Sequence, residues 1–178
     1  MTAELPAPTQ MTAPTDARAL VERLLETDAW KEMDQIDDMV ASLPNQVEMP
    51  LKHIFTPGLY TRQILIPAGT MATTRIHLTE HPFIISLGRA SVWSRETGWV
   101  NVAAPYLGVT KPGARRAIFA YEDTIWTTFH VTDKTTPDEV AREVTYMGGK
   151  FSELGIAAEN HAAQKELGIA AENKDLLT

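Results

Sequence analysis

Residues 69–88 read GTMATTRIHLTEHPFIISLG, and the interpretation of the whole chain starts from this stretch. It begins and ends with glycine, and it carries His77 and His81 among threonines, isoleucines and a phenylalanine. These β-branched and aromatic residues favour strands, and glycines between short strands favour turns. A spacing of four would place both histidines on one face of a helix, but the surrounding composition indicates strand and turn.

Strand-like stretches continue on both sides of this segment, with turn residues between them. We expect eight short strands, near residues 51–55, 59–66, 73–77, 83–87, 90–94, 99–103, 117–121 and 125–131. Eight short strands with regular turns favour an antiparallel barrel or jelly roll. Trp93, Trp99 and Trp126 are expected to fill the core of this barrel rather than an interface.

Helical periodicity flanks the strands. Residues 16–45 predict two amphipathic helices, the second with apolar residues from Trp30 to Val40 at three- and four-residue steps and a stop at Pro44. Its acids are expected on the opposite, solvent side: Asp34, Asp37 and Asp38. After the strands, Thr136, Pro137 and Glu139 predict a helix start with a capping box.

The end of the chain contains an internal repeat. The octapeptide ELGIAAEN occurs at residues 153–160 and again at residues 166–173, thirteen residues later. Thirteen residues of a straight helix turn through about 220°, so the two copies cannot bury one stripe against one flat surface. A duplication without a role and the binding of equivalent pockets on two neighbouring copies stay open. In the second case the candidate partner-binding residues are Leu154, Ile156, Leu167 and Ile169.

These patterns predict four regions. They are a Pro/Thr/Ala leader at 1–15, a helical segment at 16–45, a β-barrel at 46–132 and a helical extension at 133–178.

Composition and charge restrict the classes of function. The chain lacks cysteine, which excludes disulfides and thiolate metal sites, and no run approaches the roughly 20 apolar residues of a membrane span. The N-terminus does not have the pattern of a signal peptide. Charge divides into balances of −6 over residues 1–45, +3 over 46–132 and −4 over 133–178. Acidic arms argue against nucleic-acid binding, so we expect neither a nucleic-acid nor a membrane partner.

The glycine and histidine spacing carries a family resemblance. Gly69-x5-Arg75-x-His77-x3-His81-x6-Gly88 resembles the first cupin motif, Gly-x5-His-x-His-x3-Glu-x6-Gly. The segment KPGARRAIFA at residues 111–120 resembles the second motif more weakly, with its proline displaced by one position. The stretch from about residue 47 to 132 also resembles small cupin-like proteins of tailed bacteriophages. This resemblance implies a mainly β, cupin-like antiparallel jelly roll with helical extensions.

The same resemblance implies a changed metal site. Enzymatic cupins hold a metal with three histidines and a glutamate, but here Arg75 and Arg116 stand at the first and third histidine positions and His81 at the glutamate position. Guanidinium groups stay protonated near neutral pH and cannot donate a lone pair to a metal. His77 and His81 remain weak metal candidates, and we expect no metal and no cofactor. If Arg75 and Arg116 both point inward, we expect them to bind a small anion or to form ion pairs with Glu80, Glu122 or Asp123; otherwise one or both face solvent.

Three functions follow as alternatives. The first is a non-enzymatic structural component of a bacteriophage virion, in capsid decoration or in head or tail attachment, assembled in the host cytoplasm. Its partners would be further copies of itself, as a homo-oligomer, and other virion proteins. The second is a metal-dependent cupin enzyme with an altered site at His77 and His81. The third is a cupin that binds a small anion through Arg75 and Arg116.

Overall fold

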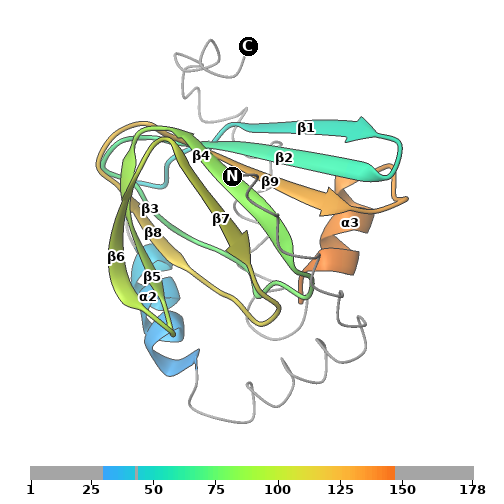
Figure 1. Cartoon of the computed structure of the whole chain (residues 1–178). Coiled ribbons are helices and arrows are strands. Elements are labelled where there is room, and N and C mark those ends of the chain that lie inside the picture. Colours follow the sequence, from blue (N-terminus) through green and yellow to red (C-terminus); the bar gives the residue numbers. More distant parts are fainter. Residues whose placement is uncertain (1–29, 43, 147–178) are drawn as a thin grey trace, which may run out of the picture.

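The computed structural model describes residues 30–42 and 44–146, which form two antiparallel β-sheets with helices at their periphery (Figure 1). The strands of this part of the chain are β1 (Leu51–Thr56), β2 (Leu59–Ile66), β3 (Met71–Thr73), β4 (His81–Leu87), β5 (Arg89–Ser94), β6 (Gly98–Ala103), β7 (Tyr106–Thr110), β8 (Ala117–Ala120) and β9 (Thr124–Val131). The helices are α2 (Lys31–Ser42) and α3 (Pro137–Val144). None of the helices in these described ranges is long and apolar enough to cross a membrane.

The strand pairing is that of a long hairpin rolled into a barrel. β5 pairs with β6 at its centre, and β4 with β7, β3 with β8 and β2 with β9 pair successively outward. Successive pairs alternate between the sheets, whose orders are β1-β2-β9-β4-β7 and β3-β8-β5-β6. This nested order is a jelly roll, to which β1 adds one more edge strand. The mainly β, antiparallel jelly roll expected from the sequence is confirmed.

One strand prediction is wrong, and one strand was not predicted. β7 was not predicted, because Gly108 interrupts its apolar pattern; a Cβ at this position would lie only 2.5 Å from the Phe83 ring. The strand expected at residues 73–77 is shorter and earlier, at β3. His77 instead forms an isolated bridge with Thr145, and its backbone N–H donates to the Ala114 carbonyl.

The barrel interior is apolar over most of its length. Alternate residues of each strand face inward and bury one cluster between the two sheets. Its buried members are Ile66, Ala72, Phe83, Ile85, Ala90, Val92, Ile118, Ala120 and Trp126. Trp126 therefore fills the core as expected, whereas Trp99 is 48% exposed and that expectation is wrong. Trp99 lies on β6, an edge strand of its sheet.

Helix α2 packs on the four-stranded sheet, where Met33 and Trp30 are buried with Trp93. Beneath the helix, the side chain of Arg115 is completely buried and its guanidinium binds the carboxylates of Asp34, at 2.9 Å, and Asp37.

The sequence placed the acids of α2 in solvent, and for Asp37, which is 5% exposed, this prediction is wrong. A buried guanidinium requires carboxylate partners, and the requirement draws an acid onto the apolar side of the helix. The earlier helix expected within residues 16–28 lies outside the described residues.

Helix α3 closes one end of the barrel. Thr136 caps it as predicted, accepting a hydrogen bond from the Glu139 backbone while its hydroxyl donates to the Glu139 carboxylate. Val140 and Val144 are buried against Tyr60 of β2. Both copies of the octapeptide, with Leu154, Ile156, Leu167 and Ile169, lie outside the described residues.

Candidate functional site

A row of polar side chains crosses the five-stranded sheet at the end of the barrel that α3 closes. The strand register pairs Tyr60 of β2 with His130 of β9, and His81 of β4 with Thr110 of β7. The β4–β9 register continues this row, so that the His81 and His130 rings lie 4.2 Å apart between centroids. Since residues directly opposite in neighbouring strands place their side chains on one face, the register alone assembles this row.

Further rings extend the row at both ends. His77, in the connection between β3 and β4, has its ring centroid 4.7 Å from that of His81. At the other end the Tyr60 ring lies 6.0 Å from His130, and the Tyr60 hydroxyl lies 2.6 Å from Nδ1 of His53. Four of the five histidines of the sequence therefore lie in one row that leads from the barrel interior to the exposed His53.

Burial and neighbouring charges keep three of these imidazoles neutral. Burial, opposed only in part by a hydrogen bond to the Thr79 backbone, lowers the pKa of His81 to about 4. Burial and the proximity of His81 lower the pKa of His130 to about 3, and burial lowers the pKa of His77 well below its usual value. At neutral pH these three rings are therefore uncharged.

Each of the three rings has a buried nitrogen without a hydrogen-bond partner in the described part of the chain. These atoms are Nδ1 of His77, Nε2 of His81 and Nδ1 of His130. For His81 the tautomer follows from its contacts: Nδ1 lies 3.1 Å from the Thr79 carbonyl, which can only accept. Nδ1 therefore carries the proton and Nε2 presents a lone pair.

Arg116 brings a positive charge to this row. Its Nη1 donates to the hydroxyl of Thr110 at 3.1 Å, and its guanidinium carbon lies 5.3 Å from the Phe83 ring centroid. Burial lowers the pKa of Arg116, an effect that Glu96 and Tyr106 oppose at longer range. Within residues 30–42 and 44–146, no carboxylate forms an ion pair with Arg116. Arg62 is also close enough for its charge to lower the pKa values of His77 and His130.

The acids considered as partners for Arg75 and Arg116 have other contacts. Glu80 binds Lys111 at 2.6 Å, Glu122 binds Arg89 at 3.4 Å, and the Asp123 carboxylate accepts from the Ala68 backbone. The buried ion-pair network is instead built on Arg115, one residue before the position that the cupin motif indicated. Arg75 is partly exposed, and it is Arg62 rather than Arg75 whose charge acts on the histidine row.

The donors at this end of the barrel do not fit the metal site of an enzymatic cupin. No group of three or more His, Asp or Glu side chains in the described ranges is arranged to hold a metal ion. The guanidinium of Arg116 approaches His77 and His81 closely enough to lower both pKa values, and it would repel a cation there. His77 and His81 do lie together, as the motif spacing suggested, but the positively charged Arg116 lies near both of them.

No protein-family model matches the sequence, and the comparison with curated proteins gave no match either. Similar solved structures include ectoine synthase from P. lautus, with 12% identity and a TM-score of 0.45 over 57% of this chain and 77% of that one. A cupin-2 domain protein from Shewanella frigidimarina has 11% identity and a TM-score of 0.39 over 55% and 92%. A cupin-2 domain protein from Halorhodospira halophila has 14% identity and a TM-score of 0.41 over 57% of this chain and 80% of that one.

The fold is a cupin-like jelly roll. This assignment follows from the nested strand order, and matches of such low identity carry no information about activity.

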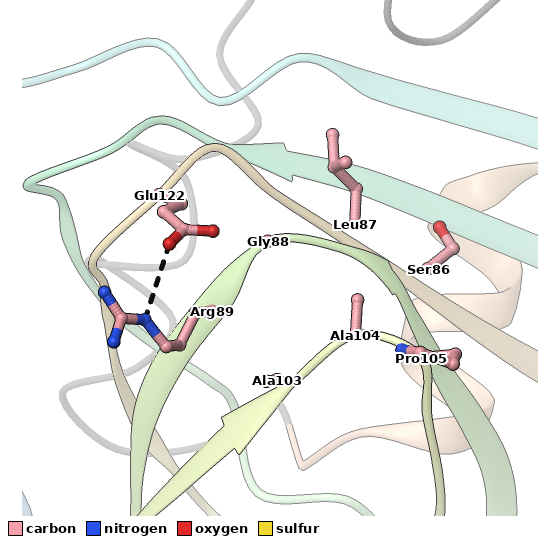
Figure 2. A pocket seen from close by; sticks show the side chains of 8 residues that line it. All are labelled: Ser86, Leu87, Gly88, Arg89, Ala103, Ala104, Pro105 and Glu122. Atoms are coloured by element: carbon pink, nitrogen blue, oxygen red, sulfur yellow. Dashed lines mark ion pairs between the residues drawn. The ribbon is translucent and has the colours of Figure 1, made fainter.

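A groove lies at the opposite end of the cupin-like barrel. The groove has a volume of about 590 Å³. Figure 2 shows the residues that line it: Ser86, Leu87, Gly88, Arg89, Ala103, Ala104, Pro105 and Glu122. Its one charged contact is the exposed pair of Arg89 and Glu122, which fixes little because solvent screens both groups. Since β4 and β9 each run the length of the barrel between this groove and the histidine row, the two sites are separate.

The edge strands of the barrel expose apolar side chains. β6 and β7 each lie at one edge of their sheet and follow each other along the chain (Figure 1). Their exposed residues include Trp99 and Val100 on β6, and Tyr106, Leu107 and Val109 on β7. We call these five side chains the edge patch. Neither strand contains a charged residue, although charges are the usual protection of an exposed edge.

Sequence reasoning did not assign Tyr60, Arg62, Arg115 or His130 to the site. His130 is 4% exposed and its Nε2 lies 3.1 Å from the Thr128 hydroxyl. A signal was present, because His130 ends the last predicted strand and His81 begins the segment next to it. Only the pairing of β4 with β9 brings them together, and the sequence does not state this pairing.

Proposed function

We propose that this chain is a non-enzymatic assembly protein, built on a cupin-like jelly roll that carries no catalytic metal. The observation on which this rests is the guanidinium of Arg116 beside His77 and His81, at the end of the barrel where a cupin enzyme holds its cation. The positive charge of Arg116 disfavours a divalent ion there.

The edge patch supports an assembly role. Leu107 is 70% exposed, and Trp99 and Val109 are each about half exposed. Apolar side chains gathered on uncharged edge strands favour contact with another protein surface, and the free backbone groups of an edge strand can pair with a further strand. A second copy of this chain is the partner we propose, in a homo-oligomer that buries the β6 and β7 edges.

The setting we propose is the particle of a tailed bacteriophage. The resemblance of residues 47–132 to small cupin-like phage proteins supports it, as do the extensions on both sides of the barrel and the repeated octapeptide. In this setting the chain decorates the capsid or attaches head or tail components. Leu154, Ile156, Leu167 and Ile169 would bind neighbouring virion proteins.

Mass spectrometry of purified phage particles tests this setting directly. The chain should be present in stoichiometric amounts, at a constant ratio to the major particle proteins through successive gradient steps. Its absence from particles made by cells that express it would contradict the virion role. Deletion of residues 150–178 should leave the barrel folded and weaken assembly, and unchanged assembly would remove the role of the repeat.

Elemental analysis distinguishes the alternative of a metal-dependent cupin enzyme at His77 and His81. The assembly proposal expects far less than one iron, manganese, nickel or zinc ion per purified chain. About one firmly bound ion per chain, lost in a His77→Ala variant, would support the enzyme instead. Circular dichroism of this variant provides the control for folding.

A further inference from the structure

Two consecutive arginines before β8 have opposite electrostatic surroundings. Arg115 is completely buried beneath α2, where the carboxylates of Asp34 and Asp37 bind it. Arg116 faces the barrel interior, where its contacts are the Thr110 hydroxyl and the Phe83 ring. A largely desolvated guanidinium without a carboxylate is unfavourable unless another anion compensates its charge. Arg116 therefore has the surroundings of a ligand-binding residue rather than of a structural ion pair.

The histidine row supplies further unused hydrogen-bonding atoms beside Arg116. Nδ1 of His77, Nε2 of His81 and Nδ1 of His130 are all buried, and each lacks a partner among the described residues. His81 and His130 are only 2% and 4% exposed. Buried polar atoms are normally satisfied, so three such atoms in adjacent rings mark a place where a polar ligand binds. Arg116, Arg62 and His77 are only partly buried, so α3 does not seal this end of the barrel from solvent completely.

The types of these atoms define the ligand. The guanidinium donates to negatively charged oxygens, and it suits two oxygens on one atom. His81 requires the reverse, because its Nδ1 proton is directed at the Thr79 carbonyl and its Nε2 can only accept. A complementary ligand must therefore carry negative oxygens for Arg116 and one hydroxyl for His81.

We propose that Arg116 and the row of His77, His81 and His130 bind a small oxyanion that retains a hydroxyl group, of which hydrogen phosphate is the simplest example. In this complex the phosphate oxygens accept from Arg116, and the phosphate hydroxyl donates to Nε2 of His81. His77 and His130 add contacts through whichever ring nitrogen faces the ligand. This site is independent of the assembly role of the edge patch.

Sulfate is the matched probe against phosphate. The two ions share their shape, but sulfate carries no proton near neutral pH. Its oxygen and Nε2 of His81 would then face each other as two acceptors, which leaves one hydrogen bond unmade and buries both lone pairs. The lowered pKa of His81 opposes rescue by protonation of the ring. Sites that hydrogen-bond a ligand hydroxyl reject analogues without it.

Isothermal titration calorimetry of the full chain with inorganic phosphate and with sodium sulfate tests the proposal. Near neutral pH, phosphate should bind at least about tenfold more tightly than sulfate. Arg116→Gln should abolish phosphate binding, and Arg89→Gln, at the far end of the barrel, should not change it. His81→Gln should bring the two affinities close together, because the glutamine amide can donate to sulfate as well as accept from phosphate.

Three results would overturn this site. They are equal affinity of the wild-type chain for phosphate and sulfate, phosphate binding that survives Arg116→Gln, and stoichiometric binding of zinc or manganese chloride in place of either anion. Because Arg116 forms no ion pair in the described structure, Arg116→Gln should remain folded. Phosphorus NMR line broadening with the Arg116→Lys variant provides a second readout that retains the positive charge.

Discussion

At the scale of single residues, Asp37 shows how a buried charge determines local structure. Its carboxylate binds the completely buried guanidinium of Arg115, and loss of one member of a buried pair leaves the other charge unpaired. We expect Asp37→Ala to lower the free energy of unfolding by about 3 kcal/mol or more, measured by urea denaturation. Removal of the exposed carboxylate in Glu122→Ala should cost less than about 1 kcal/mol. Equal losses in both variants would show that Arg115 is not held as described.

The histidine row predicts sensitivity to mild acid. The pKa of His81 is about 4 in the folded chain and near 6.5 in the unfolded chain, so between these values the unfolded state binds more protons. Stability from this group is complete above pH 6.5 and is lost as the pH falls towards 4. His130, with a pKa of about 3, acts in the same direction. Each group contributes a slope of about 1.4 kcal/mol per pH unit within its window.

Urea denaturation between pH 7 and pH 5 measures this slope, because carboxylates contribute little over that range. His81→Gln should reduce the slope of the free energy of unfolding against pH, relative to wild type, by the contribution of about one proton. An unchanged slope would mean that His81 titrates normally in the folded chain.

At the scale of elements, the two motif glycines have different reasons to be glycine. Gly69 and Gly88 both have positive φ, at 77° and 85°. A Cβ at Gly69 would meet nothing within 4 Å, whereas one at Gly88 would lie 2.3 Å from the Asp123 carbonyl oxygen. Gly69→Ala should therefore lower the free energy of unfolding by about 1–2 kcal/mol, from backbone conformation alone. Gly88→Ala should lower it clearly more, because the added Cβ also clashes with the Asp123 carbonyl. Thermal unfolding of both variants checks this order, and equal shifts in Tm would contradict the steric part.

This contrast also shows how far the sequence could predict the elements. The turn glycines, most strand positions and the Thr136 cap carry local signals in φ preference, side-chain alternation and capping chemistry, and these were found. β7 was missed because Gly108 is required by the Phe83 ring, which is distant in sequence. The partners of Arg115 were missed for the same reason, since α2 and residue 115 meet only in the folded chain.

The candidate site follows the same division. The motif spacing placed His77 and His81 together and directed attention to Arg116. It could not supply His130 or Tyr60, because their positions depend on which strands are neighbours and on the register between them. Local sequence thus predicts which residues of one segment lie close together, whereas the histidine row forms only when strands distant in sequence pair.

At the scale of the whole molecule, the edge patch predicts how copies of the chain associate. Leu107 lies on β7, an edge strand of the five-stranded sheet, and is 70% exposed, so a charge there should oppose burial against another copy. We expect Leu107→Lys to shift the chain towards monomers in size-exclusion chromatography with light scattering, while Tm at low protein concentration stays close to wild type. Val131→Lys is the matched control, because Val131 is 73% exposed but lies at the end of β9, an interior strand of the same sheet. If both variants dissociate to the same extent, total charge rather than the β7 edge controls association; if neither does, the edge patch is not the interface and the contact must lie elsewhere on the chain.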